Sequence, residues 1–370
     1  MGRWRRYGGA ALVALALIGP GGTSATAQEQ VVAPVRELTA ISAYRGHIAW
    51  SERDEATGRW RLVHARGGEL SVLPVPPRTV PFDADLGPDR RGRPTAVYSR
   101  CRREPAFSPG LVLTPDWMRA GGCDLYRLRL GAPREQRIRA VSSRRGSETT
   151  PSIWRGRLAF ARRSPRRAAA RLYVRTGGRK RPKRLRGGTI GRCVPRGCAG
   201  VPRPYAGPDA LDLGRRSLAV LWRLTNGNVI GTGVGWELRL NPLAGHRSFL
   251  VASGYVGGAC GFALPVSPNA ADRSVYFLDR AGDCTTARTL VTEVRPRAQS
   301  RREAQPATGF AYSIARDGRN FYWMRGPRPE ADGNDPGSAC RTAPGACAVV
   351  LSPNFRLGPA ATSIASPPTF

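Results

Sequence analysis

The sequence predicts an all-β fold, a six-bladed β-propeller made of four-stranded antiparallel blades. A tight β-hairpin is predicted at 152–163, where an apolar pair, an Arg-Gly turn and an alternating apolar run follow one another. A close copy occurs at 42–53, which is 110 residues earlier. Looser copies begin at Arg91, Gly214, Ala271 and Asp317, so that six hairpins recur at intervals of roughly fifty residues.

Each hairpin is followed by a connection of varying length, a third strand, a short turn and a weaker fourth strand. The third strands are expected at 60–63, 124–128, 171–174, 236–240, 289–292 and 347–351. No stretch beyond the N-terminal segment shows a sustained helical period. A four-stranded unit cannot bury both apolar faces by itself, whereas in a radial arrangement each sheet covers the next.

The repeats therefore predict one domain at 28–370. Its blades are expected at approximately 41–75, 81–139, 149–186, 207–251, 262–298 and 308–357. The apolar lead at 31–38 is a candidate for the strand that completes the last blade and closes the ring.

The repeats resemble those of TolB-type and WD-like propellers. That pattern runs Pro-x-apolar-Ser-Pro-Asp-Gly-(Lys/Arg)-apolar-Ala-Phe and continues into a short apolar-Tyr-apolar strand. The matching residues are Pro151, 156–160 and 172–174 in the third unit, 267–269 and 275–277 in the fifth, and 317–319 in the sixth. No unit keeps the full Ser-Pro-Asp-Gly. The resemblance implies a periplasmic or extracellular binding scaffold; it transfers no catalytic residue and leaves the partner open.

The N-terminus has the pattern of a secretory signal peptide at 1–27. Arg3, Arg5 and Arg6 precede a short apolar run at 10–18, and the small residues at 25–27 predict cleavage near Ala27. The apolar run is too short for a membrane-spanning helix, and no second long apolar segment follows. We expect an exported chain without a membrane span, whether extracellular, periplasmic or associated with the cell wall.

Eight cysteines in an exported chain predict disulfides rather than metal ligands. Nearest-neighbour pairing joins Cys101 to Cys123, Cys193 to Cys198, Cys260 to Cys284 and Cys340 to Cys347. Eight cysteines allow about 105 connectivities, so this pairing depends on the fold.

The net charge of +33 is carried almost entirely by arginine. One interpretation is a base composition that encodes arginine wherever a basic residue is tolerated, and the spread of arginines along the chain favours it. The other is attraction to an anionic polymer. The candidate contacts are Arg179, Lys180, Arg181, Lys183, Arg184 and Arg186. Tyr173 is the only aromatic residue in the basic run 162–186, so nucleic acid is not favoured as the partner.

The sequence predicts no cofactor, metal or catalytic residue. His47, His64 and His246 lack metal-site spacing, and His47 is expected at the surface. The acidic cluster at 330–335 lacks the EF-hand pattern, and no helix is predicted after the glycines at 231–235. There is no Gly-x-Ser-x-Gly elbow. Carboxylates can still meet in a propeller channel, and the candidates are Asp83, Asp85, Asp209 and Asp212.

The predicted long connections share one face of the propeller, and all eight cysteines lie in or beside them. Loops on a rigid scaffold often carry binding, although exposed loops also need disulfides to resist proteolysis. We expect a non-enzymatic monomeric scaffold that binds a protein or an envelope component through this face. The alternatives are a carbohydrate-active propeller enzyme and an electrostatic binder of anionic envelope polymer.

Overall fold

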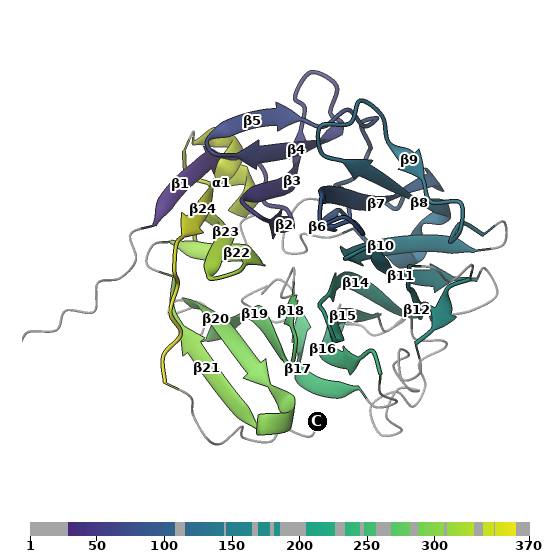
Figure 1. Cartoon of the computed structure of the whole chain (residues 1–370). Helices are drawn as coiled ribbons and strands as arrows, with labels where there is room; N and C mark the ends of the chain where they lie inside the picture. The colour runs from purple at the N-terminus through teal and green to yellow at the C-terminus, as the bar shows by residue number, and fades with distance from the viewer. Residues whose placement is uncertain are drawn as a thin grey trace, which may run out of the picture.

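The predicted six-bladed β-propeller is confirmed by a computed structural model, in which six four-stranded antiparallel sheets surround a central axis (Figure 1). The structure describes residues 29–107, 115–143, 146–164, 169–177, 181–185, 205–225, 234–244, 248–256, 268–281, 288–306, 309–328, 336–343 and 345–359. The predicted signal peptide at 1–27 lies outside them.

The strands of each blade are called A to D from the channel outward. The first blade consists of β2 (Ile41–Tyr44), β3 (His47–Arg53), β4 (Trp60–Arg66) and β5 (Glu69–Val72). The second consists of β6 (Asp85–Pro88), β7 (Pro94–Arg103), β8 (Gly121–Arg129) and β9 (Gln136–Arg137). The third consists of β10 (Ser147–Trp154), β11 (Arg157–Arg163), β12 (Arg171–Arg175) and β13 (Lys183–Arg184). The fourth blade consists of β14 (Tyr205–Leu213), β15 (Ser217–Thr225), β16 (Val234–Pro242) and β17 (Phe249–Val256). The fifth consists of β18 (Asn269–Ala271), β19 (Ser274–Ala281), β20 (Arg288–Arg295) and β21 (Ser300–Ala304). The sixth consists of β22 (Phe310–Asp317), β23 (Asn320–Gly326), β24 (Ala348–Ser352) and β1 (Gln30–Pro34).

The N-terminal strand closes the ring, as expected from the apolar lead. Strand β1 pairs antiparallel with β24, placing Gln30 opposite Leu351 and Pro34 opposite Ala348. The last blade thus combines the two ends of the propeller, and the closure consists of backbone hydrogen bonds and side-chain packing.

The two best repeats form the hairpin turns that their Arg-Gly pairs predict. Arg45 and Gly46 have φ angles of 53° and 74°, and Arg155 and Gly156 have 49° and 72°. A two-residue type I′ turn requires positive φ at both central positions, which arginine tolerates poorly and glycine well. The glycine therefore explains why these hairpins can turn so tightly.

The core consists of apolar clusters between neighbouring blades. Alternation along β3 sends Trp50 toward the sixth blade, where it packs near Met324, and sends Ala49 toward the second blade, where it packs near Tyr98. Trp50, Phe160 and Phe277 are all buried. Both faces of the inner and middle strands are thus covered, and this packing requires the ring arrangement.

Three features differ from the sequence-based expectation. The fourth blade extends to Val256, beyond the expected limit of 251. The fifth blade extends to Ala304, beyond the expected limit of 298, because the 3-10 turn η2 (Pro296–Ala298) precedes its last strand. A helix, α1 (Pro336–Thr342), lies in the connection between β23 and β24. Seven residues are two turns, too few to establish a helical period in the sequence.

Candidate functional site

A central cavity of about 560 Å³ follows the inner strands along the propeller axis. The end of the ring that carries the B–C and D–A connections is called the loop end, and the end with the A–B and C–D turns is called the turn end. Pro81, Pro115 and Trp117 line the cavity at the loop end, whereas Arg155 and Asp317 line it at the turn end. The cavity therefore extends along the whole length of the inner strands.

All four predicted carboxylates line this cavity: Asp83, Asp85, Asp209 and Asp212. The fold thus brings together residues from the second and fourth blades. Each carboxylate nevertheless forms hydrogen bonds or ion pairs with other protein groups. These contacts limit how far each one is available as a catalytic acid, base or nucleophile.

The inner strands are joined by a polar belt, defined here as Ser42, Asp85, Ser152, Asp212 and Asn269. Each belt side chain accepts a hydrogen bond from a backbone N–H of the next blade. The donors, in order, are Leu86, Ile153, Leu213, Ala270 and Arg316. The inner edge of each blade has no strand partner, so the belt satisfies main-chain donors that the sheets leave unpaired.

The belt is open between the sixth and first blades. The residue preceding the last donor, Arg316, is Ala315, which has no side-chain acceptor. Other contacts bridge this junction: the N–H of Ile41 donates to Ser313 Oγ at 2.9 Å, and the N–H of Gly46 donates to Asp317 Oδ2 at 2.6 Å. The junction between the sixth and first blades therefore uses different hydrogen bonds from the other five.

Asp85 is the central acceptor of the belt. Its Oδ1 accepts from Ser42 Oγ at 2.9 Å, and its Oδ2 accepts from Ser152 Oγ and from Ile153 N, each at 2.8 Å. Burial raises the pKa of Asp85 from 3.8 to about 6, against the opposing effect of these hydrogen bonds. Burial, followed by the charge of Asp85, also raises the pKa of Asp212 well above its usual value.

The other two carboxylates pair with buried arginines near the loop end. Asp83 accepts hydrogen bonds from Ser99 and from the N–H of Thr150, and it lies 3.5 Å from Nη1 of Arg78. Asp209 accepts from Nε of Arg223 at 2.7 Å. These interactions join neighbouring strands and blades, so both carboxylates have structural partners.

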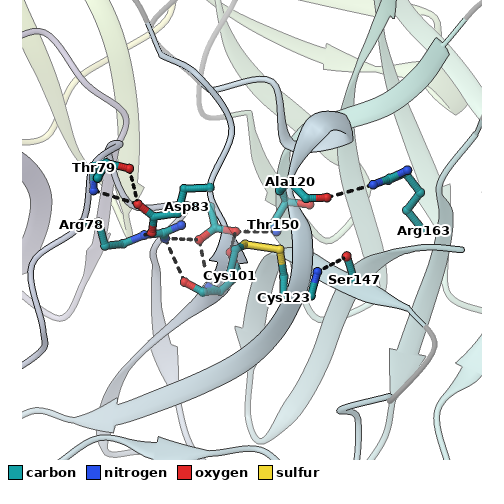
Figure 2. Close-up of a disulfide and its surroundings, with 12 residues drawn as sticks. Arg78, Thr79, Asp83, Cys101, Ala120, Cys123, Ser147, Thr150 and Arg163 are labelled. Atoms are coloured by element: carbon teal, nitrogen blue, oxygen red, sulfur yellow. Dashed lines mark hydrogen bonds and ion pairs between the residues drawn. A yellow bond between two sulfur atoms is a disulfide. The ribbon is translucent and has the colours of Figure 1, made fainter. Parts of the chain in front are cut away.

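The B–C connection of the second blade is held over the loop end by a disulfide and an ion network (Figure 2). Cys101 and Cys123 are bonded across β7 and β8, as predicted. The buried guanidinium of Arg78 donates to Glu104 at 2.7 Å and lies over the ring of Trp117 at 5.1 Å. Covalent and ionic contacts together hold this connection close to the channel.

Further contacts fix the end of this connection and the start of β8 to the third blade. The N–H of Gly122 donates to Ser147 Oγ, and Arg163 donates to the carbonyl of Ala120, each at 2.9 Å (Figure 2). The connection is therefore tied to the neighbouring blade as well as to its own.

The sixth blade has a second disulfide at the same end. Cys340 of α1 is bonded to Cys347, again as predicted, and Arg341 donates to the buried carboxylate of Glu37. Strands β7 and β23 are both second strands of their blades, so the connections that follow them emerge at the loop end. Cys193, Cys198, Cys260 and Cys284 lie outside the described residues, and their pairing stays a prediction.

The basic run is divided between the two ends of the third blade. Arg162 near the loop end donates to Glu148 at 2.8 Å and lies over Phe160 and Tyr173. Among the candidate polyanion contacts, Arg181, Lys183 and Arg184 are exposed in the C–D turn and outer strand. Arg179, Lys180 and Arg186 lie outside the described residues.

The prediction that His47 is exposed is wrong. His47 is buried, and its Nδ1 lies 2.8 Å from Nε2 of His64 on the adjacent strand. Burial and nearby positive charge lower the pKa of both imidazoles, for His64 to about 4. The sister repeat has Arg157 at the position of His47, so comparison of the two repeats could not predict a contact between His47 and His64 on adjacent strands.

No group of three or more potential metal ligands occurs in the described part of the chain. His246, the acidic cluster at 330–335 and residues 231–233 of the glycine cluster lie outside it. No helix in the described ranges is long and apolar enough to cross a membrane.

Comparison with known protein families and with curated proteins finds no match. Similar solved structures include TolB from Acinetobacter baumannii, with 12% identity, a TM-score of 0.41, and coverage of 84% of this chain and 67% of that one. They also include the α-L-arabinofuranosidase Arb93A from Fusarium graminearum, with 9% identity, a TM-score of 0.44, and coverage of 86% and 97%. A third is the GH43 endo-arabinanase from Bacillus licheniformis, with 9% identity, a TM-score of 0.33, and coverage of 70% and 93%. At these levels none of the similarities carries a functional conclusion.

The belt is the part of the site that the sequence analysis missed. Its signal was present in the two best repeats, because Ser42 and Ser152 occupy the same position, three residues before the turn arginine. Asp85, Asp212 and Asn269 are also short and polar. A hydrogen bond to the next blade, however, becomes visible only when the blades are arranged around the axis.

Proposed function

We propose that this protein is an exported, non-enzymatic propeller that binds a protein or a cell-envelope component through its loop end. The observation that carries the proposal is the fixation of the loop end: both described disulfides lie there, and Arg78 and Arg163 anchor the connection that carries Trp117. Loops that are ordered before binding lose less conformational entropy on association.

The contacts of the channel carboxylates also favour binding over catalysis. Asp85 and Asp212 accept main-chain hydrogen bonds between blades, and Asp83 and Asp209 face arginines. A glycosidase needs one carboxyl group that protonates the leaving group and another that attacks or activates water. Carboxylates committed to holding neighbouring blades together are poorly placed for these roles.

Site-specific photo-crosslinking tests the proposed binding end. A photoreactive residue at Arg119, whose side chain is 78% exposed beside the linked connection, should crosslink a discrete envelope component in cells that produce the protein. The matched control is the same residue at Arg319, exposed at the turn end. Equal products at both positions, or none at Arg119, would contradict binding through the loop end.

The carbohydrate-active alternative has one observation in its favour. Asp85 and Asp212 line the same cavity, and both have raised pKa values, as is common for catalytic acids. It predicts that the protein releases reducing ends from a polysaccharide and that Asp212→Asn abolishes this release. Our proposal predicts no release from arabinan, xylan or cell-wall glycan. Hydrolysis that depends on Asp212 would replace the binding function with an enzymatic one.

Binding to anionic envelope polymer is the third alternative. It depends on the exposed positive charge of Arg181, Lys183 and Arg184, at the outer edge of the third blade. Because these contacts are peripheral and ionic, they should be sensitive to salt.

A further inference from the structure

A second cavity, of about 410 Å³, opens at the turn end between the fourth and fifth blades. Its apolar lining comes from the C–D connection of the fourth blade, the strands that flank it, and the start of η2. These residues are Leu240, Pro242, Leu243, Ala244, Phe249 and Pro296. Phe249 is only partly buried, so part of this apolar surface faces solvent.

Five guanidinium groups and a single carboxylate surround this apolar groove among the residues that the structure describes. The arginines are Arg157, Arg215, Arg216, Arg273 and Arg297, and the carboxylate is Asp272. Arg157 is fixed in place, because it donates to the carbonyls of Gly214 and Arg215 at 3.2 and 2.7 Å. The groove is therefore strongly positive.

The other four arginines are exposed, and none forms an ion pair within the described part of the chain. Arg297 lies over the ring of Phe249, at 5.9 Å. Crowded guanidinium groups repel one another, and an anionic ligand relieves this repulsion while forming bidentate hydrogen bonds. The rim thus favours carboxylate or phosphate, and the apolar floor favours a ligand that also carries hydrocarbon.

The shape and position of the groove favour a peptide over other anions. The groove is concave, so the acyl chains of a flat bilayer would not reach its floor. Among its described lining residues Phe249 is the one aromatic side chain, which is too few for stacking a run of bases. It borders β17, the outermost strand of its blade, which pairs with no other described strand on its outer side. An extended segment can hydrogen-bond to such an edge.

We propose that this groove binds an extended acidic peptide whose apolar side chains enter between the fourth and fifth blades. Carboxylates of the peptide pair with the arginines of the rim, and Leu243 and Phe249 receive its apolar side chains. Arg215 and Asp272 also line the central cavity, so a longer peptide continues toward the channel mouth. The site lies at the opposite end from the proposed loop-end surface and goes beyond that function.

Fluorescence anisotropy of labelled peptides tests the site directly. The probe is Glu-Leu-Glu-Leu-Glu, compared with Glu-Ser-Glu-Ser-Glu and Lys-Leu-Lys-Leu-Lys. Arg273→Glu should weaken binding of the first peptide at least about tenfold, because it replaces a charge-assisted contact by repulsion. Arg319→Glu is the matched control, since it changes an exposed A–B turn arginine on another blade. It should change affinity less than about twofold.

A second pair of variants tests the apolar floor. Leu243→Ala should weaken binding about threefold to tenfold, whereas Leu70→Ala on the exposed outer strand β5 should leave it unchanged. All four side chains are at least partly exposed, and thermal melts of the variants verify that each one folds.

Several outcomes would overturn the proposal. Equal losses for Arg273→Glu and Arg319→Glu would show attraction by net charge alone. Equal binding of the serine peptide would show that the apolar floor does not contribute to binding. Binding to phosphatidylglycerol vesicles but not to the peptide, when sensitive to Arg273→Glu, would assign the groove to a membrane surface. None of these outcomes affects crosslinking at Arg119, so this site and the loop-end function can fail separately.

Discussion

Replacing Asp85 by asparagine should flatten the dependence of stability on pH. Burial raises the pKa of this carboxyl from 3.8 to about 6 in the folded protein. Because the pKa of Asp85 is higher in the folded than in the unfolded protein, protonated Asp85 stabilises the folded state. This contribution to stability is fully present below about pH 4 and is lost as the pH rises through about 6. The separation of the two values corresponds to about 3 kcal/mol.

The asparagine variant removes this ionisation but keeps most of the belt. Its carbonyl oxygen can accept from the N–H of Ile153, and its amide can donate to Ser42 Oγ. Stability at pH 4 should therefore stay within about 1 kcal/mol of the parent protein. At pH 7.5 the variant should be more stable by about 2–3 kcal/mol. The pKa of Asp212 should also fall, because the charge of Asp85 contributes to raising it.

Urea unfolding followed by tryptophan fluorescence, without reductant and from pH 4 to pH 8, measures these differences. Asp272→Asn is the control, since Asp272 is an exposed carboxylate at the turn end. A constant difference between Asp85→Asn and the parent at every pH would refute the reasoning. It would show that ionisation of Asp85 does not destabilise the folded protein.

Three further predictions concern the core, the loop end and the charge. Phe160→Ala should cost about 3–5 kcal/mol in urea unfolding, and a loss below about 1 kcal/mol would contradict the packing between blades. Replacing both Cys101 and Cys123 by serine should cost about 3 kcal/mol from the closed 22-residue segment. Hydrogen exchange should rise at 104–107 and 115–120 and stay unchanged at the turn end; a rise at both ends would contradict this local role. Binding to polyphosphate should be weak and vanish at moderate salt, and tight binding at high salt that is lost when 179–186 is neutralised would promote the polymer hypothesis.

The architecture could be predicted because each hairpin carries its own local information. The Arg-Gly pairs place positive φ at adjacent residues, and alternation beside them marks two buried faces. The recurrence of this unit then implies a ring, because a single sheet has no partner for its second face. Two disulfides could also be paired, since Cys101 and Cys123 close one connection and Cys340 and Cys347 close another.

The sequence alone thus determined the blades, their number and the pairing of the two disulfides that the structure describes. Only the tertiary structure decided which residues meet between blades. The belt from Ser42 to Asn269 and the basic groove around Phe249 are formed by residues that are far apart in the chain. Local patterning reports the period and faces of a strand, but the distance between two blades is set by how all six pack around the axis. For that reason, the roles of Asp85 in the channel and of Arg273 in the groove could be assigned only from the folded ring.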